Sequence, residues 1–172
     1  VSSRIAAAIA PDGAVILGGK TDRPIVFGAG DPDERDLQGP PDDATFCVMA
    51  LSADGDYLWH RTGSGFGAEV TALAASDAGI AFVAAEGSLA FPGTRIQVDT
   101  QGPGSIYGLL APDGAPLGAS TLQSSSAETA ADFVSFGNDG IYLTGYGKGR
   151  FVLGAGELNE SVIESNESTF LA

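Results

Sequence analysis

Short apolar runs separated by tight polar turns make up most of this chain. In the first third, such runs lie on both sides of Pro11-Asp12-Gly13 and of Asp54-Gly55. Glycine tolerates the positive φ of a tight hairpin turn, and a bounded apolar run of about four to eight residues is typical of a strand, so each turn predicts an antiparallel hairpin. The strands expected in this part of the chain are 4–10, 14–19, 45–51 and 56–61.

The first of these strands has apolar side chains on both of its faces. Ile5 and Ile9 alternate with Ala6 and Ala8 along residues 4–10. A strand without a polar face is typical of a sheet that is covered on both sides. We therefore expect this strand to be buried on both faces.

The same plan of strands and turns recurs in the rest of the chain. The turn glycines Gly13, Gly79 and Gly140 repeat at an interval of about 60 residues, which is longer than the roughly 20 to 45 residues of solenoid repeats. Residues 68–75 would suit a helix by propensity, but their place in the repeat favours a strand. The remaining strands are expected at 69–75, 80–85, 105–110, 115–122, 129–136, 141–146 and 168–172. A four-stranded unit of this length predicts the blades of a β-propeller.

Two of the repeat units share a longer order of motifs. The first contains Asp12-Gly13, Leu17-Gly18, Phe27-Gly28-Ala29-Gly30 and Leu58-Trp59, and the third contains Asp139-Gly140, Leu143-Thr144-Gly145 and Leu153-Gly154-Ala155-Gly156. This order resembles the bacterial β-propeller repeat often called the SBBP repeat, over nearly the whole chain. The middle unit departs from it, with Ala78 in place of aspartate and no tryptophan. The resemblance implies an exported or cell-surface bacterial protein, hence an extracellular location, with no fixed catalytic residues.

The expected fold is all-β, a β-propeller-like array of about three four-stranded antiparallel blades. The chain would form one domain over 1–172, alone or as part of a larger propeller, with repeat units at about 1–65, 66–126 and 127–172. The third unit reaches only its third strand, so the last blade would lack its final strand and present an open edge. Further blades, or another chain that pairs with residues 168–172, are the partners expected at that edge.

Composition and charge narrow the choice of partners. The chain has 172 residues, of which 44% are apolar, enough for a core, and its 25 glycines favour turns over long helices. The net charge of −14 argues against binding to a nucleic-acid backbone or to anionic lipid, which needs clustered Lys and Arg. No apolar run approaches the roughly 18 residues of a membrane-spanning helix. The start at Val1 rather than at methionine indicates a processed chain or a segment of a longer one.

Two motifs that suggest chemistry have simpler structural explanations. Residues 14–21 fit the looser form of the phosphate-binding loop, but Val15-Ile16-Leu17 in its middle would be a core strand and not an open loop. His60 is the only histidine, so any Ser-His-Asp triad would have to use it. We expect His60 to be a surface side chain at the rim of a blade, and its neighbour Trp59 to anchor packing between blades.

The single cysteine, Cys47, excludes an internal disulfide and a cysteine-rich metal site. It lies between Phe46 and Val48 in an apolar run. We therefore expect a buried, inert thiol, with a reactive thiol as the alternative.

The strongest polar candidate is an acidic loop at residues 31–43. Asp31, Asp33 and Asp36 place carboxylates at positions 1, 3 and 6 of this loop, and such oxygen ligands suit Ca²⁺. The spacing lacks the glycine and the glutamate of an EF-hand loop, so a solvated acidic loop is the alternative. The prolines and like charges of this segment should prevent it from forming a strand.

The function that these patterns favour is a non-enzymatic exported or cell-surface interaction or scaffold module. Its ligand would be a protein or a glycan, and Ca²⁺ would stabilise the module if the acidic loop binds it. The alternative is a fragment of a propeller-fold enzyme with an active site on the axial face, built from loops such as 62–67 and 123–128. Those loops contain few titratable groups, which favours the interaction module.

Overall fold

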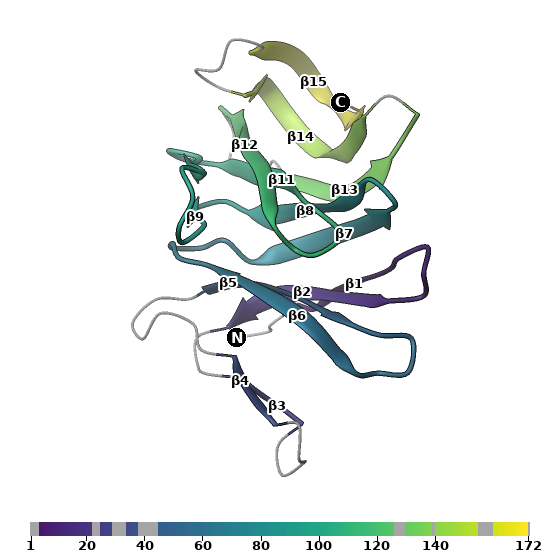
Figure 1. Ribbon diagram of the computed structural model, residues 1–172. Coiled ribbons are helices and arrows are strands. Elements are labelled where there is room, and N and C mark those ends of the chain that lie inside the picture. The colour runs from purple at the N-terminus through teal and green to yellow at the C-terminus, as the bar shows by residue number, and fades with distance from the viewer. Residues whose placement is uncertain are drawn as a thin grey trace.

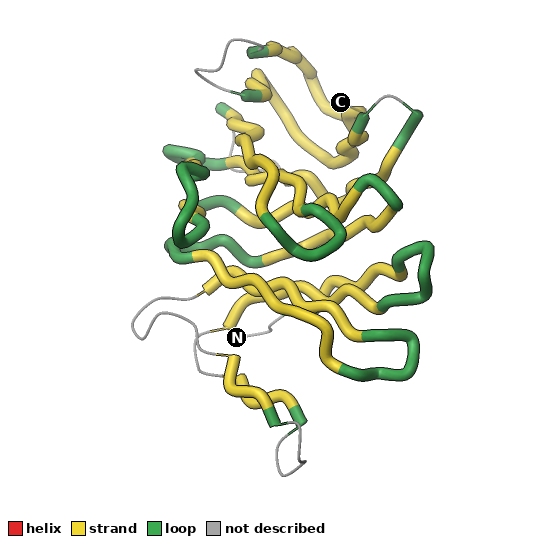
Figure 2. Tube along the Cα trace, in the orientation of Figure 1, coloured by secondary structure: helices red, strands yellow, loops and turns green. Residues whose placement is uncertain are grey.

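The computed structural model describes a chain built from β-strands (Figure 1). The described residues are 4–21, 25–28, 34–37, 45–125, 130–138, 140–154 and 160–171. Figure 2 shows strands joined by loops and turns, with no helix among these residues. The named strands all pair antiparallel, so the expected all-β, antiparallel class is confirmed.

The main strands form three successive units in which neighbours along the chain are neighbours in space. The first unit consists of β1 (Ala6–Ile9), β2 (Val15–Thr21), β5 (Thr45–Leu51) and β6 (Tyr57–Gly63). The second unit consists of β7 (Val70–Ser76), β8 (Gly79–Ala85), β11 (Gly104–Leu110) and β12 (Pro116–Ser124). The third unit consists of β13 (Ala130–Phe136), β14 (Ile141–Leu153) and β15 (Ser161–Leu171). The strand expected at 69–75, where helix propensity competed, is therefore confirmed as β7.

The second and third units belong to one seven-stranded sheet. The last residues of β14 pair with the last residues of β12, with Leu153 opposite Leu122. At the other side β13 packs against β7 and β8. The sheet therefore curls into a nearly closed, barrel-like form, which lies beside the separate four-stranded sheet of the first unit (Figure 1).

Two short hairpins were not expected from the sequence. Strands β3 (Ile25–Phe27) and β4 (Arg35–Leu37) pair with each other between β2 and β5, and β9 (Ser88–Ala90) pairs with β10 (Gln97–Asp99) between β8 and β11. The prediction that residues 31–43 contain no strand is wrong for Arg35–Leu37. The apolar run of β3 supplies a partner backbone, and three residues are few enough to fit between the prolines of the loop.

The third unit contains longer strands than expected. Strands were predicted at 141–146 and 168–172, whereas β14 continues to Leu153 and β15 begins at Ser161. In the first two units a separate short hairpin lies between the second and third main strands. In the third unit, the end of β14 and the start of β15 pair in its place as direct extensions of the main strands. A register shift between Gly147 and Gly149 marks the junction, as expected for a β-bulge. Of the strands described, β15 pairs with β14 alone.

Strand β8 is buried on both faces because it has neighbours on both sides. Ile80 and Phe82 pack against the first unit in one hydrophobic core, and Ala81 and Val83 pack against β13 and β14 in a second core. Phe82 also meets Phe46 of the first unit edge to face, with ring centroids 4.9 Å apart. The three units therefore stack as layers with the second unit in the middle (Figure 1).

The prediction that residues 4–10 are buried on both faces is wrong. Ala6 and Ala8 pack against the first core, but Ile5 is 77% exposed and Ile9 is 73% exposed. The first unit has a described neighbour on one side only, so the other face of β1 is open to solvent.

Gly18 allows the first two units to approach closely. A Cβ atom at this position would lie 2.7 Å from Val70 Cγ1 and 3.0 Å from Leu73 Cδ1, closer than packed side chains tolerate. The glycine in β2 therefore lets the side chains of β7 contact the backbone of the first sheet.

Candidate functional site

The candidate site is the outer face of the first unit, which points away from the second unit. Its residues lie in three cross-strand rows: Ile9, Val15 and Leu51; Ala7, Leu17, Met49 and His60; Gly19, Cys47 and Thr62. Successive side chains of a strand point to opposite faces, so this set alternates with the residues that pack in the core. The face is apolar except along its β6 edge.

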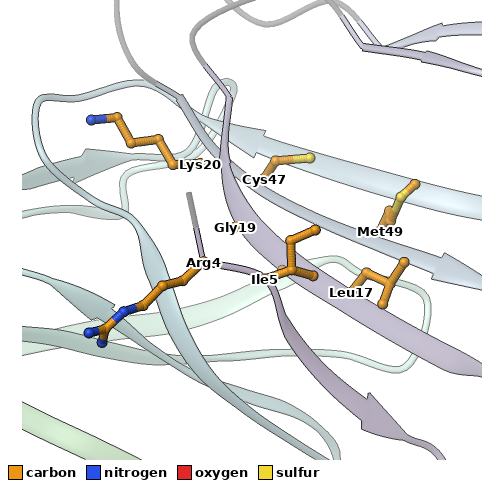
Figure 3. Close-up of a pocket in the computed structure, with 8 residues that line it drawn as sticks. Arg4, Ile5, Leu17, Gly19, Lys20, Cys47 and Met49 are labelled. Atoms are coloured by element: carbon orange, nitrogen blue, oxygen red, sulfur yellow. The ribbon is translucent and has the colours of Figure 1, made fainter. Parts of the chain in front are cut away.

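A groove of about 290 Å³ crosses this face (Figure 3). It is lined by Arg4, Ile5, Leu17, Gly18, Gly19, Lys20, Cys47 and Met49. Figure 3 shows Ile5, just before β1, near the apolar side chains of β2 and β5, whereas the charged ends of Arg4 and Lys20 point away from them. The groove therefore offers apolar contact area with positive charge at its margin, and no acidic residue is among the described residues that line it.

Cys47 lies in this groove with its thiol largely shielded from water. Its side chain is 7% exposed, and burial raises the pKa of the thiol from the ordinary 9.0 to about 11. A raised pKa keeps the thiol protonated near neutral pH, where the nucleophilic thiolate is scarce. The prediction of a buried cysteine is confirmed.

His60 lies on β6 at the edge of the same sheet, half-buried. The hydroxyl of Tyr57 is 2.7 Å from His60 Nδ1. Burial, and then the neighbouring Arg61 charge, lower the pKa of the imidazole, which favours its neutral form. A pocket of about 320 Å³, which Pro92 also lines, adjoins these residues. The rim position expected for His60 matches this edge strand, although the side chain is only partly at the surface.

Trp59 connects the first unit to the second. Its Nε1–H donates to the carbonyl oxygen of Pro112 at 3.1 Å, and its ring packs against the first core. Arg61 Nε–H donates to the carbonyl oxygen of Gly114 at 2.8 Å. The two side chains hold the hairpin turn of the second unit, so the expected role of Trp59 in packing between units is confirmed.

The other predicted candidates are placed as follows. Asp31 and Asp33 lie outside the described residues, and Asp36 lies in β4 opposite Val26. The calcium site therefore stays a prediction. Among the described residues, no group of three or more His, Cys, Asp and Glu could hold a metal ion.

The structure places the rejected phosphate-binding loop and most of the first predicted axial loop. The middle of the motif lies in β2, which pairs with β1 on one side and β5 on the other, so its backbone N–H groups do not form an open cradle. Residues 64–67 are bridged to β9 at Ser64 and Gly67. Of the second loop, 126–128 lie outside the described residues.

Sequence reasoning predicted that residues 4–10 are covered on both faces because the apolar residues of the outer face look like core residues. Ile5, Leu17 and Met49 are apolar residues in strands, and the alternation pattern alone does not separate a covered face from an open one. The sequence signal for an open face is the number of repeat units: three units are fewer than the roughly four to eight of a closed propeller, so the faces of the first and third units are expected to be uncovered.

Comparison of the chain with protein-family models, with curated proteins and with solved structures gave no match. In the part of the chain that the structure describes, no helix has the length and apolar character of a membrane span.

Proposed function

We propose that the chain is a run of three β-propeller units, similar to the SBBP repeat, that acts as a non-enzymatic interaction or scaffold module of an exported or cell-surface protein. The module binds another β-sheet on the outer face of its first unit. The observation that carries this proposal is the open apolar face itself: Ile9 is 73% exposed, and Ile5, which lines a groove of about 290 Å³, is 77% exposed. Exposed apolar patches on a folded chain are typical of interaction sites.

The strand register supports propeller-type units. The second hairpin turns have the same backbone hydrogen bonds, from Ser52 N–H to Asp56 O and from Ala111 N–H to Ala115 O. The residue just before each turn, Leu51 in the first unit and Leu110 in the second, pairs with the preceding strand. Leu51 lies opposite Val15 and Leu110 lies opposite Ile80, so Val15 and Ile80 occupy equivalent positions. The first two units are therefore equivalent strand by strand, with a short hairpin inserted at the same point in each.

This equivalence supports the proposal that a neighbouring unit covers the outer face of the first unit. Ile80 and Phe82 correspond to Val15 and Leu17, and they are 2% and 0% exposed beneath the inner face of the first unit. In the first unit the corresponding face has no described neighbour. A sheet that packs like the first unit on the second is thus the kind of partner that fits.

The distribution of titratable groups favours binding over catalysis. His60, the only histidine of the chain, is paired with a tyrosine hydroxyl at a sheet edge. The described lining of the groove offers a shielded thiol and two basic side chains but no carboxylate to act as a general base.

The test supplies the missing neighbour within the same chain. A chimera carries an additional copy of residues 1–65 ahead of the original chain, so that the inner face of the copy can cover the outer face of the original first unit. The reporter is Ile9→Cys in the original unit, and Cys47→Ala in both copies removes the competing thiol. Phe66→Cys, at a position that is 80% exposed and lies outside this face, is the matched control.

In dilute, monomeric protein, the Ile9→Cys thiol should react with iodoacetamide at least about 10-fold more slowly in the chimera than in the original chain, because the covering sheet has to open first. The Phe66→Cys thiol should react equally in both. Equal reaction of the Ile9→Cys thiol in the two proteins would show that the first unit does not accept a neighbouring sheet, and the proposed function would be wrong.

A further inference from the structure

We infer that the sheet which covers the outer face of the first unit is the outer face of the third unit of a second copy of this chain. Two copies would then close one ring through two equal interfaces. This inference rests on the proposed function and names the partner of the same site.

The third unit presents a second open apolar face at the opposite end of the stack. Phe133 is 69% exposed, Tyr142 is 37% exposed and Tyr146 is 49% exposed. Val134 and Leu143, the neighbours of these residues along the strands, point the other way into the second core. Because side chains alternate along a strand, the three aromatic residues share the face of β13 and β14 that points away from the second unit.

The packing order within the chain shows how the two open faces correspond. The inner face of the first unit covers one face of the second unit, and the opposite face of the second unit, with Ala81 and Val83, contacts the third unit. The units therefore stack head to tail. The outer face of the third unit is the next covering face in this order, and the outer face of the first unit is the next face to be covered.

Head-to-tail contacts between copies produce either a closed ring or an open filament. Propellers close with about four to eight units. The described strands of one 172-residue copy form three units, so two such copies bring six and three bring nine. Two copies are therefore the number that falls in the range of closed propellers.

Opposite charges lie beside the two faces at one point. Arg4 and Lys20 line the margin of the groove on the first unit, and they are two of only eight basic residues in the chain. On the third unit Asp132 is exposed next to Phe133, whereas Lys148 and Arg150 are exposed further along β14. Opposite charges at the rims of two apolar faces promote the correct encounter and orientation.

The experiment measures the mass of the 172-residue chain in solution by sedimentation equilibrium, over a range of concentrations. The monomer has a mass of 17.3 kDa, and the ring of two copies has twice this mass. Ile9→Glu and Phe133→Glu each place a carboxylate in both interfaces. Each variant should raise the dissociation constant at least about 100-fold, because an unpaired charge is costly to bury.

Phe66→Glu is the control for an exposed apolar residue outside both faces, and it should leave the dissociation constant unchanged. Since Ile9 and Phe133 are largely exposed in the monomer, their glutamate variants should keep the melting temperature of the dilute original chain. A variant that loses this melting transition is replaced by Ile9→Ser or Phe133→Ser.

Mixing the two glutamate variants tests the head-to-tail arrangement directly. The Ile9→Glu chain keeps an intact third unit and the Phe133→Glu chain keeps an intact first unit, so the mixture should form heterodimers through one unaltered interface. If the two first units contacted each other instead, Phe133→Glu would not raise the dissociation constant. If the copies formed open filaments, the mass would grow beyond two copies as the concentration rises. Either result overturns the ring.

A chain that stays monomeric at every concentration also overturns the inference, but it leaves the proposed function intact if the chimera still protects the Ile9→Cys thiol. If the chain is monomeric and the chimera gives no protection, both proposals are wrong.

Discussion

The glycine of the second hairpin turn in the second unit should be far less replaceable than its counterpart in the first unit. Gly114 and Gly55 occupy equivalent Asp-Gly turns, with φ of +80° and +91°. A Cβ atom on Gly55 would have nothing within 4 Å, whereas a Cβ atom on Gly114 would lie 2.6 Å from the Trp59 ring. The two Gly→Ala variants therefore share the backbone strain and differ in the contact between units.

The expected losses of stability follow from these two costs. An alanine with left-handed backbone costs about 1–2 kcal/mol, part of which is offset by the smaller conformational entropy of the unfolded chain. Gly55→Ala should therefore lose about 1 kcal/mol. Gly114→Ala must in addition displace the ring of Trp59, which weakens its hydrogen bond to Pro112 and its packing in the core. Its total loss should be about 2–4 kcal/mol.

The assay is urea unfolding followed by the fluorescence of Trp59, the only tryptophan of the chain. For a chain of this size, each kcal/mol also lowers the melting temperature by about 2–4 °C. A double-mutant cycle with Trp59→Ala, followed by circular dichroism, measures the coupling between the two sites. In the Trp59→Ala background the difference between the Gly114→Ala and Gly55→Ala variants should largely disappear. Equal losses in the original background would refute the reasoning.

Three further predictions concern titration and metal binding. The neutral Cys47 thiol contributes fully to the free energy of unfolding below pH 9, and this contribution, at most roughly 2–3 kcal/mol, should be lost as the pH rises towards 11. In urea unfolding, the Cys47→Ala variant should lack this part of the alkaline loss of stability. An equal alkaline loss in both proteins would contradict the prediction. The pKa of His60 is lowered, so the neutral imidazole contributes fully to the free energy of unfolding above the ordinary pKa near 6.5. This contribution should be lost as the pH falls through the lowered pKa. His60→Gln should flatten the melting temperature between about pH 7 and pH 5, whereas the same slope in both proteins would exclude this role. Ca²⁺ should raise the melting temperature of the original chain but not that of the triple variant with asparagine at Asp31, Asp33 and Asp36, and the absence of any effect of Ca²⁺ would favour the solvated loop.

Turns were the part of the fold that could be predicted with most detail from the sequence. Gly13, Gly55 and Gly114 all have the positive φ that their Asp-Gly turns imply, and the strand at Thr45–Leu51 was predicted with its observed bounds. These features depend on local backbone preferences, which a few neighbouring residues determine. The short hairpin at β3 and β4 was missed because a three-residue strand depends on its partner more than on its own sequence.

The sequence by itself determined where the chain turns and which residues alternate along each strand, and therefore the all-β class. Only the tertiary structure decided which apolar faces are covered. Ile9 and Phe82 both lie in apolar strands next to a predicted turn, yet Ile9 is 73% exposed and Phe82 is fully buried. Burial depends on which sheet packs against a face, and that neighbour comes from a distant part of the chain or, as we infer, from a second copy.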